Sequence, residues 1–483
     1  MTRKIIGPFN RVEGDLEVEV EITDGKVSKA WVNSPLYRGF EQIMQGKPPL
    51  DALVYTPRIC GICSVAQSVA SANALADAQG IKPELNGQLV TNIILACENL
   101  SDHLTHFYMF FMPDFARDDY QDKSWYEDIE PRFRSQTGSA TNYMLKARAD
   151  FMHITGILAG KWPHSLSIQP GGTTTSPTAA DKVKLSAILM GFRQFLETHL
   201  FADTLENISQ LTSAKQLQQW ADSHGASDFG HFLTIADDLK LNTLGKIKAN
   251  FMSYGAYKIA DKHLFSQGLW FADNGEVTEL DTQLISEDIS HSWMLADQQA
   301  AHPSQGTTIP DQEMANGYSW CKAPRYNQRV IEVGAVARQM IDQHPLITDL
   351  VTNDQSNVKN RIVARILELA RLVPEMEKWC QQIKPDQPFI NEQAMPKDAT
   401  GHGLIEAARG SLGHWINISQ GKILNYQVIA PTTWNFSPRD QNNNSGALEQ
   451  ALLNTKIDRE GKNSVLIQHI VRSFDPCMVC TVH

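Results

Sequence analysis

The sequence lacks the features of several common protein classes. No stretch approaches the roughly 18 consecutive apolar residues of a membrane-spanning helix, so no direct membrane span is expected. No basic stripe is present, and the net charge of −11 argues against nucleic acid as a main partner. The first residues carry no apolar run of signal-peptide length, so we expect a cytoplasmic location, with any export depending on a partner's signal.

Cysteine is also scarce, with seven residues in 483, which is too few for a disulfide framework in so long a chain. An odd number that includes two Cys-x-x-Cys pairs is typical of a reduced compartment with a metal site or a redox motif. Cys97, Cys321 and Cys380 lie in apolar surroundings and are predicted to be small buried hydrophobic residues without a ligand role.

Helical periodicity and a small β portion make up most of the pattern. Apolar and acidic residues alternate over 16–22 before the Asp24-Gly25 turn, which predicts a β-hairpin over 16–32. Apolar residues recur at helical spacing in four ranges: 86–111, 141–160, 180–212 and 358–382. We expect an α+β, predominantly α-helical fold in one large unit. Its expected parts are an N-terminal β portion (1–50), a helical core (51–260), a strand and loop insertion (261–320), and a helical core with a C-terminal metal-binding segment (321–483).

Cys60 and Cys63 form the first cysteine pair, and Cys477 and Cys480 form the second. Two intervening residues let both thiolates of a pair reach one ion, and soft thiolates select zinc, copper(I), nickel or iron. A structural zinc site is one alternative, but its pairs usually lie about 15–20 residues apart. A thioredoxin-like redox motif is another, but neither pair lies in a clear βαβ setting. The third alternative joins both pairs on one catalytic metal, which the spacing alone does not name.

Longer motifs around the cysteines narrow this choice. The segments 58–63 (RICGIC) and 475–483 (DPCMVCTVH) resemble the paired signatures of nickel–iron hydrogenase large subunits. Five further motifs follow in that family's order, at 11–14, 37–41, 102–108, 408–415 and 425–435. The resemblance covers nearly the whole chain. It implies the family's fold, with a central bundle of long helices, and the family's reaction, the heterolytic cleavage of H2.

The resemblance also implies a role for each thiolate. All four would bind nickel, and Cys63 and Cys480 would also bridge to an iron that carries carbon monoxide and cyanide. Cys477, terminal on nickel like Cys60, would take the proton of H2, because coordination keeps a thiolate deprotonated while leaving it a lone pair. Glu13 resembles the glutamate that relays this proton. Without the motif, Glu13 is simply a residue that flanks a strand.

Other residues would surround the metals. Arg409 resembles an arginine whose guanidinium lies over the centre and suits a cyanide ligand, with Asp102 and Asp475 as the carboxylates that hold it. Thr432, next to Pro431, aligns with a residue whose hydroxyl donates to the other cyanide. Taken singly, each of these residues is more often a surface or capping residue.

Three more residues resemble the ligands of a magnesium-type ion that fixes the C-terminal segment in the core. They are Glu41, His483 and the backbone carbonyl of Val428. Hard oxygen ligands suit magnesium, although imidazole is less typical. Taken alone, His483 is a terminal residue of the kind that often frays.

Three positions depart from the pattern of most family members. Gln67 stands where a histidine is usual, Ile62 where many have valine, and Phe110 where many have leucine. The two larger side chains would narrow the path for gas and hinder O2 more than H2. The trio resembles the hydrogen-sensing branch, although exchanges of one methylene are also common in ordinary cores. We therefore expect an H2 sensor, with a cytoplasmic uptake hydrogenase as the alternative.

Partners follow from what the sequence cannot supply. The three remaining cysteines are too few and too scattered for an iron–sulfur cluster, so an iron–sulfur small subunit is implied. Maturation proteins that insert nickel are implied too, as is a histidine kinase if the complex is a sensor. Two competing functions are a metal-free relative, like the quinone-side subunit of respiratory complex I, and a zinc-stabilised scaffold. The complex I subunit lacks the four cysteines that this chain has.

Overall fold

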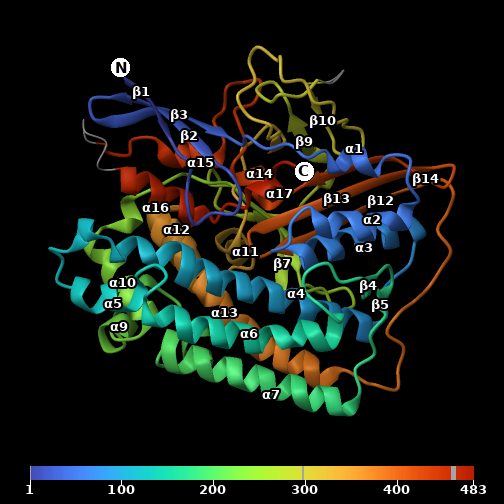
Figure 1. Ribbon diagram of the computed structural model, residues 1–483, viewed down its shortest axis with the longest axis horizontal. Helices are drawn as coiled ribbons and strands as arrows, with labels where there is room; N and C mark the ends of the chain where they lie inside the picture. The colour runs from blue at the N-terminus through green and yellow to red at the C-terminus, as the bar shows by residue number, and fades with distance from the viewer. Residues whose placement is uncertain (1, 296–298, 458–463) are drawn as a thin grey trace.

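The computed structural model describes residues 2–295, 299–457 and 464–483, so residues of the predicted ranges at 1, 296–298 and 458–463 lie outside the described residues. Helices dominate, and small sheets lie beside them (Figure 1). This confirms the predicted α+β fold. In the described parts of the chain, no helix is both long and apolar enough to cross a lipid bilayer.

The helices are α1 Phe40–Met44, α2 Ala52–Tyr55, α3 Ser64–Gln79, α4 Leu85–Thr105, α5 Tyr126–Phe133, α6 Ser139–Ala159, α7 Ala179–Phe195, α8 Leu205–Ser209, α9 Ala214–Ser223, α10 Asp228–Asp238, α11 Ala335–Ile341, α12 Pro345–Asp354, α13 Val358–Gln382, α14 Pro431–Asn435, α15 Ala447–Leu452, α16 Ser464–Phe474 and α17 Met478–Thr481. The strands are β1 Thr2–Ile6, β2 Glu17–Thr23, β3 Lys26–Asn33, β4 Ile168–Gln169, β5 Gly172–Thr173, β6 Phe251–Ala256, β7 Phe265–Trp270, β8 Val277–Thr278, β9 Ile285–Asp288, β10 Ala300–Ala301, β11 Ala323–Tyr326, β12 Ala399–Ala407, β13 Gly410–Ser419 and β14 Lys422–Ile429.

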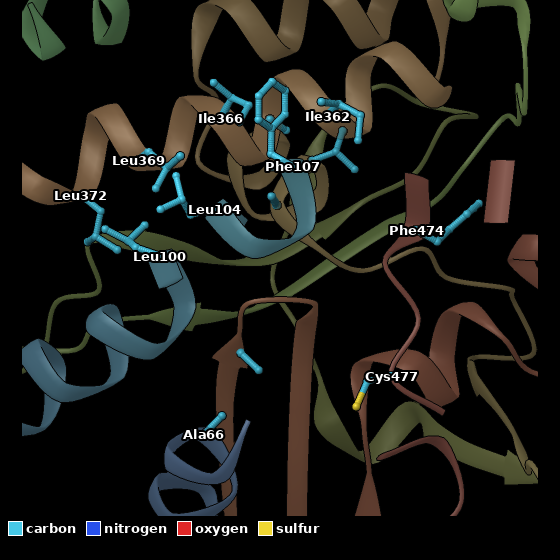
Figure 2. Packing of buried hydrophobic residues seen from close by; sticks show 14 of the residues in the cluster. Ala66, Leu100, Leu104, Phe107, Ile362, Ile366, Leu369, Leu372, Phe474 and Cys477 are labelled. Atoms are coloured by element: carbon cyan, nitrogen blue, oxygen red, sulfur yellow. The ribbon is translucent and has the colours of Figure 1, made fainter. Parts of the chain in front are cut away.

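Four long helices, α4, α6, α7 and α13, form the bundle in the lower half of Figure 1. The buried face of α4 repeats apolar residues at helical spacing, and α13 does the same. Figure 2 shows labelled side chains from both: Leu100 and Leu104 of α4 with Phe107 of the turn that follows it, and Ile362, Ile366, Leu369 and Leu372 of α13. The predicted ranges 86–111, 141–160 and 358–382 are confirmed as helical, whereas 180–212 is broken at 201–204 and its last helix, α8, ends at Ser209. Two of the four ranges continue into π-helical turns, at His106–Phe111 and Leu196–Leu200.

The predicted hairpin over 16–32 is also confirmed. Strands β2 and β3 pair antiparallel around Asp24-Gly25, and β1 adds a third strand on the other edge of β2. Val18 and Val20 are fully buried, because alternate residues of β2 face the core.

A second sheet was not predicted. Strands β12, β13 and β14 pair antiparallel within 321–483, a range expected to be helical apart from its metal-binding segment. Strand β13 is almost entirely buried, so its sequence shows no alternation of polar and apolar residues that would reveal a strand. Strand β12 lies against α3, and a Cβ at Gly401 or Gly403 would collide with the backbone of that helix. These glycines let the sheet hold α3 closely.

Candidate metal centre

The first cysteine pair lies in the turn that leads into α3. Cys63 is the N-cap residue of this helix, and its carbonyl accepts a hydrogen bond from the amide of Gln67 at 3.0 Å. Glu98 of α4 accepts from the amides of Val65 and Ala66, both at 2.9 Å. This buried carboxylate satisfies donors that a helix N-terminus leaves free, and it fixes the turn that carries Cys63.

Sequence reasoning did not find Glu98. The signal that could have found it is an acidic residue directly after the apolar run 93–97 of α4. Burial raises the pKa of Glu98 to about 8, although hydrogen bonds from Val65, Ala66 and Trp162 act in the opposite direction.

The second pair lies between α16 and the end of the chain, and polar contacts hold it. The Cys477 amide donates to Oγ1 of Thr432 at 3.1 Å. The hydroxyl of Thr433 donates to the carbonyl of Thr481 at 3.0 Å. From α13, Arg365 donates to the carbonyls of Ser473 and Phe474 at 2.7 and 3.0 Å, just before the pair. The segment is therefore fixed on both sides of its cysteines.

All four cysteine sulfurs lie within 4.8 Å of one another. The Sγ atoms of Cys60 and Cys477 are 3.4 Å apart, and those of Cys63 and Cys480 are 3.0 Å apart, although 417 residues separate the members of each contact. Among the described residues, this is the one group of three or more histidine, cysteine or acidic side chains that could hold a metal ion. Three of its cysteines are buried and Cys63 is half-buried. The donor set fits a soft metal.

Arg409 is buried near the sulfurs of Cys477 and Cys63. Its guanidinium donates to both oxygens of Asp102, at 2.5 and 3.2 Å, and to Oδ1 of Asp475 at 3.1 Å. Burial raises the pKa of Asp102 to about 7. Arg409 acts in the opposite direction, and the neighbouring Asp475 offsets part of its effect. The two carboxylates therefore fix the position of one buried cation close to the cysteines.

Glu13 reaches the same place from the N-terminal end of the chain. Its backbone forms a parallel bridge with Cys477, in which the Met478 amide donates to the Glu13 carbonyl at 2.7 Å. Gly14 permits this approach, because a Cβ there would lie 3.1 Å from Cβ of Met478 on a backbone with φ +82°. Burial and the adjacent Cys60 sulfur raise the pKa of Glu13, against a smaller opposing effect of Arg409.

The three residues expected at a magnesium-type ion also converge. Nε2 of His483 lies 2.7 Å from the Val428 carbonyl oxygen and 3.3 Å from Oε1 of Glu41. Adjacent ligands of an octahedral Mg2+ with bonds of about 2.0–2.1 Å would be separated by about 2.9 Å, which lies between these two distances. Burial alone would raise the pKa of Glu41, but Lys322 and His483 bring it down to about 2.

Lys322 and Thr308 were missed by the sequence reasoning. Thr308 donates to Oε2 of Glu41, and Nζ of Lys322 lies 3.4 Å from the same oxygen and 3.4 Å from Glu287. Both missed residues lie outside the motifs, in or beside the predicted insertion, and no local pattern links them to Glu41. A lysine among apolar residues at 321–324 is the one available hint of a buried ion pair.

The remaining predicted site residues occupy distinct positions. Ile62 lies between the cysteines of the first pair, half-buried against the core. Phe110 is half-buried in the π-helical turn after α4. Gln67 is buried, and its Oε1 accepts from Nε2 of His414 at 2.8 Å. Pro431 is the buried first residue of α14, next to Thr432.

Cys97, Cys321 and Cys380 are buried, which confirms the prediction that they behave as small hydrophobic residues. Burial raises the pKa of each thiol. None of the three belongs to the four-sulfur cluster.

Comparison with known proteins decides the family. Residues 38–118 and 135–483 match the pattern described as nickel-dependent hydrogenase. The chain belongs to this family. It is 30% identical to the periplasmic [NiFeSe] hydrogenase large subunit of Desulfomicrobium baculatum, over 99% of this chain and 94% of the relative. It is 27% identical to the uptake hydrogenase large subunit of Rhodobacter capsulatus, over 100% and 95%.

Solved structures agree with this membership. The reduced [NiFeSe] hydrogenase of D. vulgaris Hildenborough superposes with a TM-score of 0.84 at 28% identity and covers 100% of both chains. The protein is therefore a hydrogenase large subunit that oxidises H2, and its four-cysteine site fits a nickel–iron centre. Hydrogenase large subunits work with a small subunit, so this chain is one part of a complex.

Proposed function

We propose that this hydrogenase large subunit acts as an H2 sensor, cleaving H2 heterolytically and reporting it to a signalling partner. Cys60, Cys63, Cys477 and Cys480 would hold the nickel, and Cys63 and Cys480 would bridge to an iron with carbon monoxide and cyanide ligands. Such a centre supplies the hydride acceptor that the reaction needs. The single observation that carries the assignment of this centre is the meeting of four sulfurs from distant parts of the chain, within 4.8 Å.

The proton of H2 would go to the sulfur of Cys477 and then to Glu13. The backbone bridge between these residues supports the transfer, because it fixes the two chain segments side by side. The raised pKa of Glu13 supports it too, since a carboxylate with a raised pKa is a better proton acceptor.

Arg409 and Thr432 would hold the cyanide ligands, next to Pro431. Asp102 and Asp475 bind one side of the guanidinium and so fix its orientation. The Thr432 oxygen accepts from the Cys477 amide, which leaves its own proton free for donation. Glu41, Val428 and His483 would hold Mg2+ and so tie the last residue of the chain to β14.

The sensing role rests on Ile62, Phe110 and Gln67. Ile62 occupies the turn between two ligands, where one extra methylene narrows the surroundings of the centre. Gln67 begins a series of hydrogen-bonded side chains that runs through His414 to Tyr426, where Nδ1 of His414 lies 2.8 Å from the Tyr426 hydroxyl. Burial lowers the pKa of His414 to about 3, so this series carries no charge. The alternative is uptake of H2 with delivery of electrons to a respiratory carrier, favoured by the relative named an uptake hydrogenase.

An iron–sulfur small subunit would cover the turn Gly61–Cys63, where the sulfur cluster comes nearest to solvent. Nickel-insertion proteins would load the site, and a histidine kinase would receive the sensing signal. We place the complex in the cytoplasm, a proposal that the three unpaired cysteines outside the metal centre, Cys97, Cys321 and Cys380, support.

The test begins with the purified complex. We expect nickel and iron in the protein and infrared bands of bound carbon monoxide and cyanide. Zinc alone, without these bands, would overturn the nickel–iron assignment. For the sensing role, we expect slow H2 turnover and kinase phosphorylation that responds to H2. Fast turnover with a redox carrier and no response of the kinase would support uptake instead.

A further inference from the structure

A buried carboxylate outside the metal centre gathers an unusual number of cations. Asp114 follows the π-helical turn and is fully buried. Its Oδ1 accepts from Arg11, and from Arg117 at 2.8 Å. Arg472 reaches both oxygens, at 3.0 and 2.7 Å, and Nδ1 of His469 lies 3.1 Å from Oδ2. We call Asp114 and these four partners the Asp114 cluster.

Two of the partners come from the segments that carry the proposed proton-transfer residues. Arg11 precedes Glu13 by two residues, and Arg472 precedes Cys477 by five. Arg472 also binds the first segment directly, donating to the carbonyl of Asn10 at 2.8 Å and to its side chain at 2.7 Å. The cluster therefore ties both segments to one point just before they form the bridge between Glu13 and Cys477.

The bridge itself is a weak connection. It consists of one short backbone hydrogen bond, from Met478 to Glu13 at 2.7 Å, and one long one, from Glu13 to Pro476 at 3.4 Å. Charge-assisted hydrogen bonds to a buried carboxylate are roughly twice as strong as neutral ones. The spacing of the two segments therefore depends more on the Asp114 cluster than on the bridge.

We propose that Asp114 is a positioning residue for proton transfer: through Arg11 and Arg472 it sets the separation of Glu13 from Cys477. This inference rests on the proposed roles of those two residues. In the step concerned, the S–H bond of Cys477 breaks, an O–H bond forms on the Glu13 carboxylate, and no electrons leave the cysteine. A small error in separation is costly for such a transfer, because misplacement by about 1 Å can slow a reaction by about a hundredfold.

Arg11 is the side chain best suited to a test. Its removal leaves Asp114 with Arg117 and Arg472, so no buried charge loses its last partner. Arg11 also borders a surface cavity of about 920 Å3, so water can take the space of the shortened side chain. Arg117 offers a matched control. It belongs to neither proton-transfer segment, binds Asp114 from three residues along the same segment, and also donates to Oε1 of Gln468 in α16 at 2.7 Å.

The experiment compares Arg11→Gln with Arg117→Gln in the purified complex. D2 in H2O measures exchange with solvent protons, and conversion of para-hydrogen in D2O measures cleavage without exchange. For Arg11→Gln we expect the ratio of exchange to conversion to fall roughly ten- to a hundredfold. We also expect a larger solvent isotope effect, with an unchanged KM for H2, metal content and infrared spectrum. Arg117→Gln should match the unaltered complex.

Several outcomes would overturn the proposal. An unchanged ratio in Arg11→Gln would do so, and so would an equal fall in Arg117→Gln or a loss of metal that accounts for the whole effect. If the complex with Arg11→Gln does not assemble, Arg11→Lys replaces it, because lysine keeps the charge but lacks the planar guanidinium that binds a carboxylate. The ratio of exchange to conversion in Arg11→Lys then tests the proposal. Glu13→Gln distinguishes failure of the proposed proton relay from failure of the positioning role. Normal exchange in that variant rejects the relay itself, while lost exchange with a normal Arg11→Gln rejects only the positioning role.

Discussion

The two cysteine pairs contribute equally to one cluster, but they are held in different ways. Cys60 and Cys63 stand at the start of α3, which packs against β12 through Gly401 and Gly403. The second pair stands on a short segment fixed by buried charges, mainly Arg409, Arg365 and the Asp114 cluster. Close packing positions the first pair, and ion pairs position the second.

This difference separates two kinds of vulnerability. A packed helix tolerates changes of charge at a distance but not added volume, because the interior has little free space. A segment held by buried ion pairs tolerates small changes of volume but not the removal of one charge, which strands its partner. Changes at the second pair, at its ion pairs, at the packing of α3 and at Ile62 with Phe110 should therefore have different effects.

The largest effect is expected for the second pair itself. Cys477→Ser should abolish H2 oxidation and largely spare the fold, because the hydroxyl that replaces the thiolate is a poor ligand and proton acceptor for this chemistry. Hydrogen consumption and thermal unfolding of the purified complex measure the two effects. Cys97→Ser, outside the cluster, should keep its activity. Retained activity in Cys477→Ser would count heavily against the assignment of the centre.

Arg409→Met tests the charges that hold the second pair. It leaves Asp102 and Asp475 buried without their shared guanidinium, so the free energy of unfolding should fall by about 3–5 kcal/mol. Denaturant unfolding measures the loss. Adding Asp475→Asn to this variant should recover part of it, because one stranded charge disappears. A double variant no more stable than the single one would mean that packing, and not charge, holds this segment.

Gly403→Ala tests the packing that holds the first pair. The added methyl group collides with the carbonyl of Ala70 in α3, so the free energy of unfolding should fall by about 1–3 kcal/mol. Gly191→Ala is the control, since nothing lies near the added Cβ on the outer side of α7 and a gain of about 0.4–1 kcal/mol is expected. Equal stability of the two variants would remove the proposed support of α3 by β12.

The smallest effect is expected for Ile62 and Phe110, one beside each of the two regions that hold the cysteine pairs. Ile62 belongs to the first pair's turn, and the Phe110 carbonyl accepts from Arg11 of the Asp114 cluster at 3.3 Å. Ile62→Val with Phe110→Leu should raise sensitivity to O2 while leaving the metal content unchanged. Loss of hydrogen-oxidation activity after timed exposure to O2 provides the measurement. Unchanged tolerance would leave the narrowed gas path without support.

Sequence alone predicted the parts of the fold that have a clear period. Helices α6 and α7 and the hairpin have one exposed and one buried face, and the apolar residues of the largely buried α4 still recur at helical spacing. Strand β13 shows no such repeat because both its faces are buried. The sheet β12–β14 was therefore missed, although it determines where α3 and Cys63 lie.

The site divides in the same way. The cysteines, Arg409 and Glu13 lie in motifs, which place them in the site without any knowledge of their contacts. Asp114 and Glu98 lie outside those motifs, and each is explained only by partners far away in sequence. Both are acidic residues in apolar stretches of sequence, a signal of burial that does not name the partner.

The distance along the chain between the two cysteine pairs has a further consequence. An ion held by both pairs works as a cross-link that closes nearly the whole polypeptide into one loop. Because only the folded chain presents all four sulfurs together, binding of the ion adds directly to the free energy of unfolding. Removal of the metal would therefore lower the melting temperature of the subunit, and this temperature would depend on the concentration of free metal.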